Sequence, residues 1–218
     1  AVVVGPSGVE GGIGAEGERA ERLARTGAAL LEAAASVPHG SAAEVCRVEE
    51  LRLAVGDMRY PLATKNLHHE IELVVAIGQA GSEVSPERAN DLVFGYATGL
   101  DMTRRDLQTD MREKKRPWDL GKSFAQSAPI APIHPKSQTG VLSRGAITLD
   151  VNGVRRQSGD LADLIWDVPN TLSFLSRYYE LLPGDLIFTG TPAGVGAVVA
   201  GDRLDGHIAG LSSLSIKI

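Results

Sequence analysis

The sequence predicts an α+β fold with a β-rich core. From residue 60 onward, short runs rich in β-branched residues are separated by Gly and Pro, as strands and turns are. The expected strands outnumber the helices and do not alternate regularly with them, which argues against a doubly wound parallel sheet. The length of 218 residues, with 43% apolar and 22% charged residues, suits one domain, alone or with an appendage.

The first 59 residues differ sharply in composition from the rest. All ten aromatic residues lie at Tyr60 or later, and residues 1–59 contain no Lys, Asn or Gln. Aromatic side chains bury the most surface per residue, so this segment is a poor candidate for a core of its own. We therefore expect an atypical Gly/Ala-rich N-terminal segment at 1–59 and a separate folded domain at 60–218.

The N-terminal segment opens with AVVVG, which predicts a short strand, and continues into an expected helix at 18–35. Between them, residues 12–17 fit the G-x-G-x-x-G pattern of a nucleotide-binding turn. That turn needs its glycines directly after the strand, whereas eight residues separate Val4 from Ile13. A Gly-rich linker into a helix is the favoured interpretation, and a nicotinamide site is the alternative.

The first half of the expected domain contains two strands and two helices. Residues 70–77 are rich in β-branched residues and stop at Gly78, which predicts a strand. Ser-Pro-Glu at 85–87 predicts the start of a short helix that runs to Leu92. A second strand is expected at 94–100 and a charged helix at 103–115.

The second half is expected to begin with a hairpin. Asn152-Gly153 is a preferred two-residue turn, and it joins expected strands at 147–151 and 154–157. An amphipathic helix is expected at 168–182, ending at Pro183-Gly184. Strands at 185–189 and 211–218 complete the prediction.

Charge and composition exclude several classes of function. The formal net charge of -5 argues against a nucleic-acid-binding face. No apolar run approaches the roughly 20 residues of a membrane helix, and AVVVG is too short for a secretory signal. The single cysteine, Cys46, rules out an internal disulfide and a cysteine-built metal site. We expect a cytoplasmic protein that binds neither nucleic acid nor membrane.

Two carboxylates in the first strand suggest a metal site. Side chains alternate along a strand, so Glu70 and Glu72 share one face, while Ile71, Leu73 and Val75 point into a core. Neighbouring carboxylates repel each other, and a divalent cation offsets that repulsion. A solvated strand face is the alternative interpretation.

A third carboxylate, Asp101, directly follows the next expected strand. Three carboxylate oxygens suit Mg²⁺, with Mn²⁺ or Ca²⁺ as substitutes, better than zinc. His68 shares the face of Glu70 and is more simply an orienting neighbour than a ligand, while His69 must face away.

The charged helix offers groups that recognise a small acid. Arg105 and Gln108 lie three residues apart and so share a helix face. Arginine presents a planar fork to a carboxylate, and glutamine can bond a carbonyl. The remaining cations nearby are expected to be solvated surface groups: Arg104, Arg112, Lys114, Lys115 and Arg116.

Two further positions could bind an anion or take part in catalysis. Lys122 lies in an apolar stretch, where an ammonium can neutralise an oxyanion or hold a carboxylate. Residues 188–196 form a strand end that runs into a Gly-rich turn containing Thr191, whose N–H and hydroxyl groups can receive an anion. A plain structural turn is the alternative.

Four ordered motifs resemble the fumarylacetoacetate hydrolase family. They are LHHEIEL at 67–73, LDMTRRD at 100–106, KSF at 122–124 and TGTP at 189–192. The resemblance spans about residues 60–218. It is strongest to the bacterial fumarylpyruvate and acylpyruvate hydrolases, notably in YPLATK at 60–65 and PGDLIF at 183–188.

The resemblance implies a mixed β-sandwich roll with a few short helices, usually a homodimer with one Mg²⁺ or Mn²⁺ per subunit. It implies that Glu70, Glu72 and Asp101 are the metal ligands of a catalytic domain at 60–218. The positions that match substrate-holding residues of the family are Arg105, Gln108, Lys122 and Thr191. Lys122 and Thr191 are also the candidates for steadying charge during catalysis.

The implied reaction is hydrolysis of the C–C bond in a 2,4-diketo acid, such as fumarylpyruvate or another acylpyruvate, to pyruvate and a carboxylic acid in aromatic catabolism. Two alternatives share this site: decarboxylation or isomerisation of a 2-oxo acid such as oxaloacetate, and an impaired homologue that binds metal and 2-oxo acid without turnover.

One feature of the related hydrolases has no match in this sequence. They carry a Gly-Arg-Asn-Tyr turn and a water-activating His-x-x-Glu pair upstream of the metal motif. The upstream histidine here, His39, is followed by Glu44 five residues later, which does not fit that spacing. General-base catalysis typically contributes about 10²- to 10⁴-fold in rate, so the identity of the base bears directly on activity.

Overall fold

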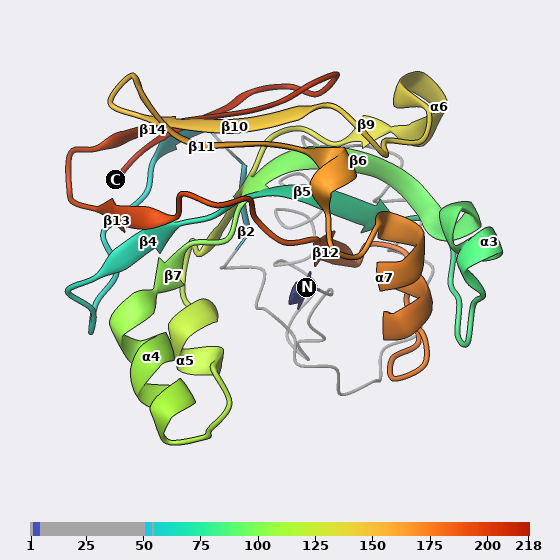
Figure 1. Ribbon diagram of the computed structural model, residues 1–218, viewed down its shortest axis with the longest axis horizontal. Coiled ribbons are helices and arrows are strands. Elements are labelled where there is room, and N and C mark those ends of the chain that lie inside the picture. Colours follow the sequence, from blue (N-terminus) through green and yellow to red (C-terminus); the bar gives the residue numbers. More distant parts are fainter. Residues whose placement is uncertain (1, 5–50, 54) are drawn as a thin grey trace, which may run out of the picture.

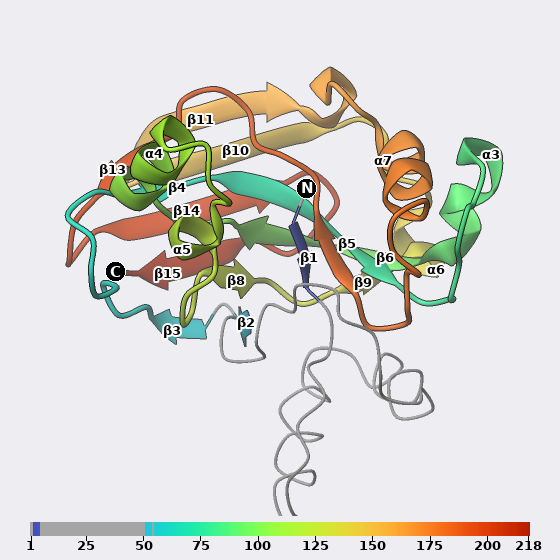
Figure 2. The ribbon, with the colours of Figure 1, turned by 90° about the horizontal axis from the view of Figure 1, so that it is seen from below.

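The computed structural model describes residues 2–4, 51–53 and 55–218. Figure 1 shows two layers of strands, with β5, β6 and β12 in one layer and β10, β11 and β14 in the layer above it. Helices α4 and α5 lie at one end of these layers, and α3 and α7 lie at the other, in both Figure 1 and Figure 2. The predicted mixed β-rich fold with few short helices is thereby confirmed.

The larger layer is a seven-stranded sheet whose path runs β1-β12-β5-β6-β8-β2, with β9 paired to β6. The pairs within it are antiparallel, except that β2 runs parallel to β8. Its strands are β1 (Val2–Val4), β2 (Leu51–Leu53), β5 (Ile71–Ile77), β6 (Val93–Leu100), β8 (Ala128–Ile130), β9 (His134–Pro135) and β12 (Leu186–Phe188).

The second layer is a five-stranded sheet in the order β11-β10-β14-β15-β3. Its members are β3 (Val55–Asp57), β10 (Ala146–Val151), β11 (Val154–Asp160), β14 (Arg203–Ile208) and β15 (Leu214–Lys217). A small sheet, β13-β4-β7, adjoins the two layers. It consists of β4 (Leu67–His69), β7 (Thr103–Arg104) and β13 (Gly196–Val198).

The helices are short and lie outside the sheets. The α-helices of the described residues are α3 (Pro86–Ala89), α4 (Arg105–Glu113), α5 (Asp119–Lys122), α6 (Lys136–Thr139) and α7 (Val168–Leu175). Two 3₁₀ turns, η1 (Asn90–Leu92) and η2 (Leu161–Asp163), extend this set. None of the helices in the described part of the chain is long and apolar enough to cross a membrane.

Strand β5 is buried on both faces, which decides the environment of Glu72. As predicted, Ile71, Leu73 and Val75 are fully buried and belong to the main core between the layers. Val74 belongs to a second cluster of buried apolar residues, and side-chain alternation puts it on the opposite face, the face of Glu72. Glu72 therefore lies at the edge of an apolar layer, and the alternative of a solvated strand face is wrong.

Two expected helices are shorter than the pattern predicts. The helix expected at 103–115 begins only at Arg105, because Thr103 pairs with His68 in the small sheet. The helix expected at 168–182 ends at Leu175, because the carbonyl of Ser176 accepts the Glu83 N–H at 2.8 Å instead of continuing the helix.

The other elements agree closely with the prediction. The hairpin forms around Asn152-Gly153, and the strands at residues 94–100, 185–189 and 211–218 are present with ends shifted by at most three residues. The short strand of AVVVG is present and pairs with β12. The expected helix at 18–35 and the G-x-G-x-x-G segment at 12–17 lie outside the described residues.

Candidate functional site

The three carboxylates expected to act together do converge in the structure. Glu70 lies between β4 and β5, Glu72 lies in β5, and Asp101 follows β6 directly. The antiparallel pairing of β5 with β6 brings their ends together, and the Asp101 N–H donates to the Glu70 carbonyl at 2.9 Å. One carboxylate oxygen from each residue lies within 4.8 Å of the others, and all three residues are buried.

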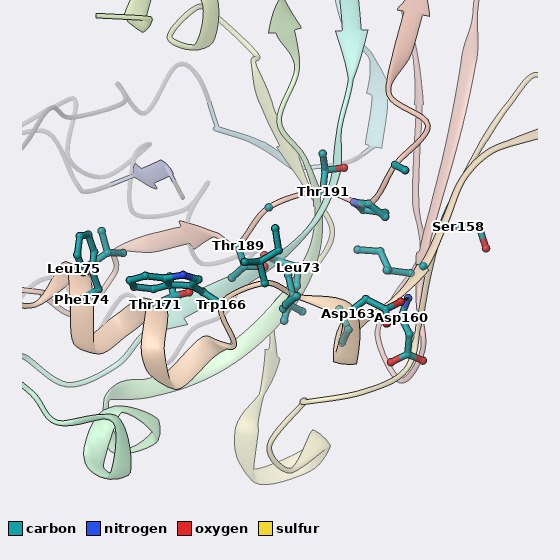
Figure 3. Close-up of a pocket in the computed structure, with 18 residues that line it drawn as sticks. Leu73, Ser158, Asp160, Asp163, Trp166, Thr171, Phe174, Leu175, Thr189 and Thr191 are labelled. Atoms are coloured by element: carbon teal, nitrogen blue, oxygen red, sulfur yellow. Dashed lines mark hydrogen bonds between the residues drawn. The ribbon is translucent and has the colours of Figure 1, made fainter.

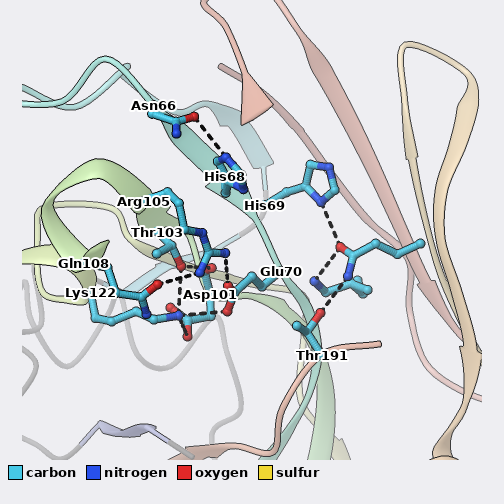
Figure 4. A network of polar contacts seen from close by, with 12 residues as sticks. Asn66, His68, His69, Glu70, Asp101, Thr103, Arg105, Gln108, Lys122 and Thr191 are labelled. Carbon is cyan, nitrogen blue, oxygen red and sulfur yellow. Dashed lines mark hydrogen bonds and ion pairs between the residues drawn. The ribbon is translucent and has the colours of Figure 1, made fainter. Parts of the chain in front are cut away.

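Lys122 is the cation at the centre of this cluster (Figure 4). Its Nζ donates to Glu70 Oε2 at 2.8 Å, to Asp101 Oδ2 at 2.6 Å and to Thr103 Oγ1 at 2.8 Å. Burial lowers the pKa of Lys122, but Asp101 and Glu70 outweigh this and raise the pKa above its ordinary value. The side chain is therefore a charged donor at neutral pH and not a base.

Glu70 is the most strongly compensated carboxylate of the cluster. It pairs with Lys122 on one oxygen and with the Arg105 guanidinium on the other. Burial raises the pKa of Glu70, but the two cations more than offset burial and hold the pKa below its ordinary value. Glu70 is accordingly ionised and oriented by side chains from α4 and α5.

When both are ionised, Glu72 and Asp101 would carry negative charge that the neighbouring cations do not fully balance. Burial, followed by the charge of Asp101, raises the pKa of Glu72 to about 8, although the Gly190 N–H donates to it at 2.7 Å. Burial also raises the pKa of Asp101, despite Lys122. A divalent cation would remove this excess. Three buried carboxylate oxygens form a donor set that fits Mg²⁺ or Mn²⁺.

Helix α4 presents Arg105 and Gln108 side by side, as the spacing predicts. The Arg105 Nη1 donates to Gln108 Oε1 at 2.6 Å, next to the carboxylate cluster (Figure 4). Arg104 does not behave as the expected solvated cation, because its guanidinium carbon lies 4.4 Å from the ring centre of Phe124. The other cations expected at the surface are exposed: Arg112, Lys114, Lys115 and Arg116.

The two histidines of the metal motif point away from the carboxylates. His68 Nε2 lies 2.9 Å from Asn66 Oδ1, and His69 Nδ1 lies 2.8 Å from Gln157 Oε1. Burial lowers the pKa of both histidines. The group of potential metal ligands found in the described part of the chain contains no histidine. His69 therefore has the expected orientation. His68 is not among the candidate ligands, as preferred, but its ring contacts Asn66, and among the residues that the structure describes no hydrogen bond to a carboxylate supports the expected orienting role.

Thr191 lies in the turn after β12, and this turn is anchored from two sides. Its Gly190 N–H bonds Glu72, and Thr189 Oγ1 donates to the Leu73 carbonyl at 3.0 Å. Thr191 Oγ1 accepts from Gln157 Nε2 at 2.8 Å. The turn is therefore held against β5 and β11 next to the carboxylate cluster.

Sequence reasoning missed Gln157, which is fully buried. The sequence predicts this residue at the end of a hairpin strand and indicates no role for it. Its register offered a signal, because Gln157 pairs with the core residue Leu149 across the hairpin. A glutamine at an inward-facing strand position requires buried hydrogen-bond partners.

A pocket of about 810 Å³ borders the same turn on another side (Figure 3). Its lining includes Thr189 and Thr191, and its opposite part is formed by η2 and α7. Trp166 and Phe174 lie in the wall with ring centres 5.0 Å apart, edge to face. The turn thus borders both a polar, charged cluster and a largely apolar cavity.

Comparison with known proteins identifies the family to which this chain is similar. The family model described as fumarylacetoacetate (FAA) hydrolase C-terminal matches residues 27–218. A fumarylpyruvate hydrolase from Ralstonia sp is 51% identical over 159 residues, which cover 73% of this chain and 82% of that protein.

A solved structure and further relatives extend this result. The crystal structure of a fumarylpyruvate hydrolase from Pseudomonas aeruginosa in complex with Mn²⁺ and pyruvate superposes with a TM-score of 0.74 at 51% identity, covering 78% of this chain and 74% of that one. The mitochondrial oxaloacetate tautomerase FAHD1 of Homo sapiens is 41% identical, covering 72% of each chain. Oxaloacetate tautomerase YcgM of Escherichia coli is 37% identical, covering 71% of this chain and 74% of that protein.

Proposed function

Because the chain belongs to the fumarylacetoacetate hydrolase family, we propose that it is a Mg²⁺-dependent acylpyruvate hydrolase, an enzyme that cleaves a carbon–carbon bond. The substrate would be fumarylpyruvate or a similar 2,4-diketo acid, and the products would be pyruvate and a carboxylic acid, as in aromatic catabolism. The observation that carries this proposal is the buried cluster of Glu70, Glu72 and Asp101 beside Lys122 and Arg105. The relative that is solved with Mn²⁺ and pyruvate supports it.

In this proposal the three carboxylates hold the metal, with Mg²⁺ as the physiological ion and Mn²⁺ or Ca²⁺ as substitutes. The chemistry that such an ion supplies when bound is Lewis-acid stabilisation of the charge that develops on the 2-oxo acid half of the substrate. Arg105 pairs with Glu70, and Lys122 with both Glu70 and Asp101, so these cations preserve the cluster's geometry before any ligand arrives.

The residues around the cluster would bind and orient the acid. Arg105 and Gln108 present a guanidinium fork and an amide from one helix face, suited to a carboxylate and a keto oxygen. Lys122 keeps its proton and would steady developing negative charge as an ammonium. The Thr191 hydroxyl would meet the substrate from the opposite side, on the turn after β12.

A second reaction on the same site is tautomerisation of oxaloacetate. One observation favours it: relatives named as oxaloacetate tautomerases are 41% and 37% identical to this chain. Tautomerisation moves a proton and requires no attack by water. Decarboxylation of the same 2-oxo acid likewise requires no activated water.

The loss of fumarylpyruvate absorbance, followed with and without Mg²⁺, tests the proposal. Rapid Mg²⁺-dependent decay to fumarate and pyruvate is the expected result, with Glu72→Ala as the inactive control. If fumarylpyruvate does not decay but the enol–keto conversion of oxaloacetate is accelerated, the enzyme is a tautomerase and not a hydrolase. Binding of Mg²⁺ and oxalate without turnover of either substrate would identify an impaired homologue.

The proposal extends to the domain boundary and the oligomeric state of the protein. The residues proposed for the site all lie within 60–218, which we take as the catalytic domain, with 1–59 as a separate N-terminal segment. We propose a homodimer in which each subunit holds its own metal. Sedimentation velocity with and without Mg²⁺ tests this, and a monomer at micromolar concentration would contradict it.

A further inference from the structure

The side chain of Gln157 is a buried junction between the metal motif and the Thr191 turn. Its Oε1 lies 2.8 Å from His69 Nδ1 and 3.2 Å from the Ile71 backbone nitrogen. Its Nε2 lies 2.8 Å from Thr191 Oγ1 and 2.9 Å from the Pro192 carbonyl oxygen. An amide has two donor hydrogens and one oxygen with two acceptor sites, so these four contacts use its full capacity.

These partners define which end of the amide faces which group. The Pro192 carbonyl only accepts hydrogen bonds, so the amide nitrogen must face it. The Ile71 N–H only donates, so the amide oxygen must face β5. It follows that His69 carries a hydrogen on Nδ1 and that Gln157 donates to the hydroxyl of Thr191.

The direction of that last hydrogen bond determines what Thr191 can do. A hydroxyl has one hydrogen to donate, and Gln157 does not compete for it because it donates to the oxygen itself. The Thr191 hydrogen is therefore available to another acceptor. The adjacent Gly190 N–H is bonded to Glu72, which keeps the turn beside the carboxylate cluster.

We infer that Gln157 is a positioning residue that makes the Thr191 hydroxyl a hydrogen-bond donor toward an anionic oxygen of the bound 2-oxo acid. This inference rests on the proposed function for the nature of the ligand. Its chemical consequence is selectivity for ligands that present an oxygen acceptor at this point, such as a carboxylate or an enolate.

A double-mutant cycle tests whether Gln157 acts through Thr191. In Gln157→Glu, the new carboxylate accepts where the amide donated, and it draws the Thr191 hydrogen toward itself. We expect Gln157→Glu to weaken oxalate binding in the presence of Mg²⁺ by about 10- to 100-fold, the effect of losing one hydrogen bond to a charged group. In the Thr191→Val background the same change should cost less than about threefold, because no hydroxyl remains to orient.

Two controls accompany this cycle. Gln138→Glu makes the same charge change on an exposed residue of α6 and should leave oxalate binding unchanged. Gln157→Met removes the donor without adding charge and should reproduce the loss only where Thr191 is present. Equal losses for Gln157→Glu in both backgrounds would overturn the inference and leave Gln157 a purely structural residue.

The readouts separate this inference from the proposed function. Oxalate binding requires no turnover, so a wild-type protein that binds oxalate but cleaves no diketo acid would refute the hydrolase while the cycle still tests Gln157. Failure of the wild-type protein to bind oxalate with Mg²⁺ would overturn the inference, since the hydroxyl would have no anion to meet. If the variants do not fold, neutron diffraction from the wild-type protein with Mg²⁺ and oxalate locates the hydroxyl deuterium. Its position toward oxalate is expected, and a position toward Gln157 would overturn the inference.

Discussion

Glu72 is the carboxylate of the cluster with the clearest need for a cation. It lies at the edge of an apolar layer, and burial and Asp101 raise its pKa to about 8. We expect Glu72→Ala to abolish Mg²⁺ binding measured by calorimetry, because it removes one of the three proposed ligands. Glu87→Ala, at an exposed position of α3, is the matched control. Unchanged Mg²⁺ affinity in Glu72→Ala would remove Glu72 from the proposed ligand set.

A different outcome is expected for Lys122, because its ammonium group balances the charge of the carboxylates and does not bind a metal ion. We expect Lys122→Met to lower turnover by about 10²- to 10³-fold, the usual cost of losing one group that stabilises developing charge. Without metal, Glu70 and Asp101 would repel each other more strongly in this variant. Mg²⁺ should therefore raise its melting temperature more than it raises that of the wild type. Wild-type kinetics in Lys122→Met would exclude Lys122 from the mechanism.

Most residues of the cluster were predictable from the sequence, and the reason is local. Alternation along one strand places Glu70 and Glu72 together, and Asp101 ends the neighbouring strand. The helical spacing of Arg105 and Gln108 is equally local. The hairpin register indicates that Gln157 faces the core, but its partners lie up to 88 residues away, as with His69, so local periodicity does not identify them.

At the scale of elements, the turn after β12 depends on close contact with β11. Gly194 has a φ of +101°, and a Cβ there would lie 2.1 Å from the Arg156 carbonyl oxygen. Gly201 has nearly the same φ, +97°, but a Cβ there would meet no atom within 4 Å. An alanine at Gly201 would therefore suffer backbone strain alone, whereas an alanine at Gly194 would suffer both backbone strain and steric overlap.

We expect Gly201→Ala to destabilise the fold by about 1 kcal/mol, the cost of a left-handed conformation in a residue with a side chain. Gly194→Ala should cost several times more and also weaken oxalate binding, because β11 and Gln157 must shift. Urea denaturation and calorimetry measure the two effects. Equal destabilisation by the two substitutions would show that the turn tolerates separation from β11.

Among the predicted elements that the structure describes, α7 is the one whose length differs most from the prediction. Apolar residues recur at helical spacing beyond Leu175, so the pattern predicts a helix to residue 182. In the structure the Ser176 hydroxyl accepts the Val84 N–H at 2.9 Å, and Leu181 forms a bridge with Gly81. The helix ends because Ser176 and Leu181 form hydrogen bonds and a bridge with residues 81–84, about ninety residues earlier in the chain. The local sequence pattern does not indicate this distant contact.

At the scale of the whole molecule, Asp185 links stability to pH. Burial raises the pKa of Asp185 to about 6, although its carboxylate accepts the Leu182 N–H. The folded state then binds a proton between about pH 4 and 6 that the unfolded state does not, so the free energy of unfolding falls as pH rises through this range.

Asp185→Asn should remove this contribution. We expect the variant to gain stability relative to the wild type between pH 4.5 and 7, by up to about 3 kcal/mol for a shift of about two pH units. Urea denaturation of both proteins at these two pH values measures the difference. A constant difference in unfolding free energy across this range would show that Asp185 does not titrate within it.

The position of Arg105 and Gln108 on α4 has an evolutionary consequence. Helix α4 has no buried residue, whereas Glu72 lies inside the seven-stranded sheet. Mutations on α4 can therefore accumulate at little cost to folding, while mutations in the sheet are removed by selection for a folded protein.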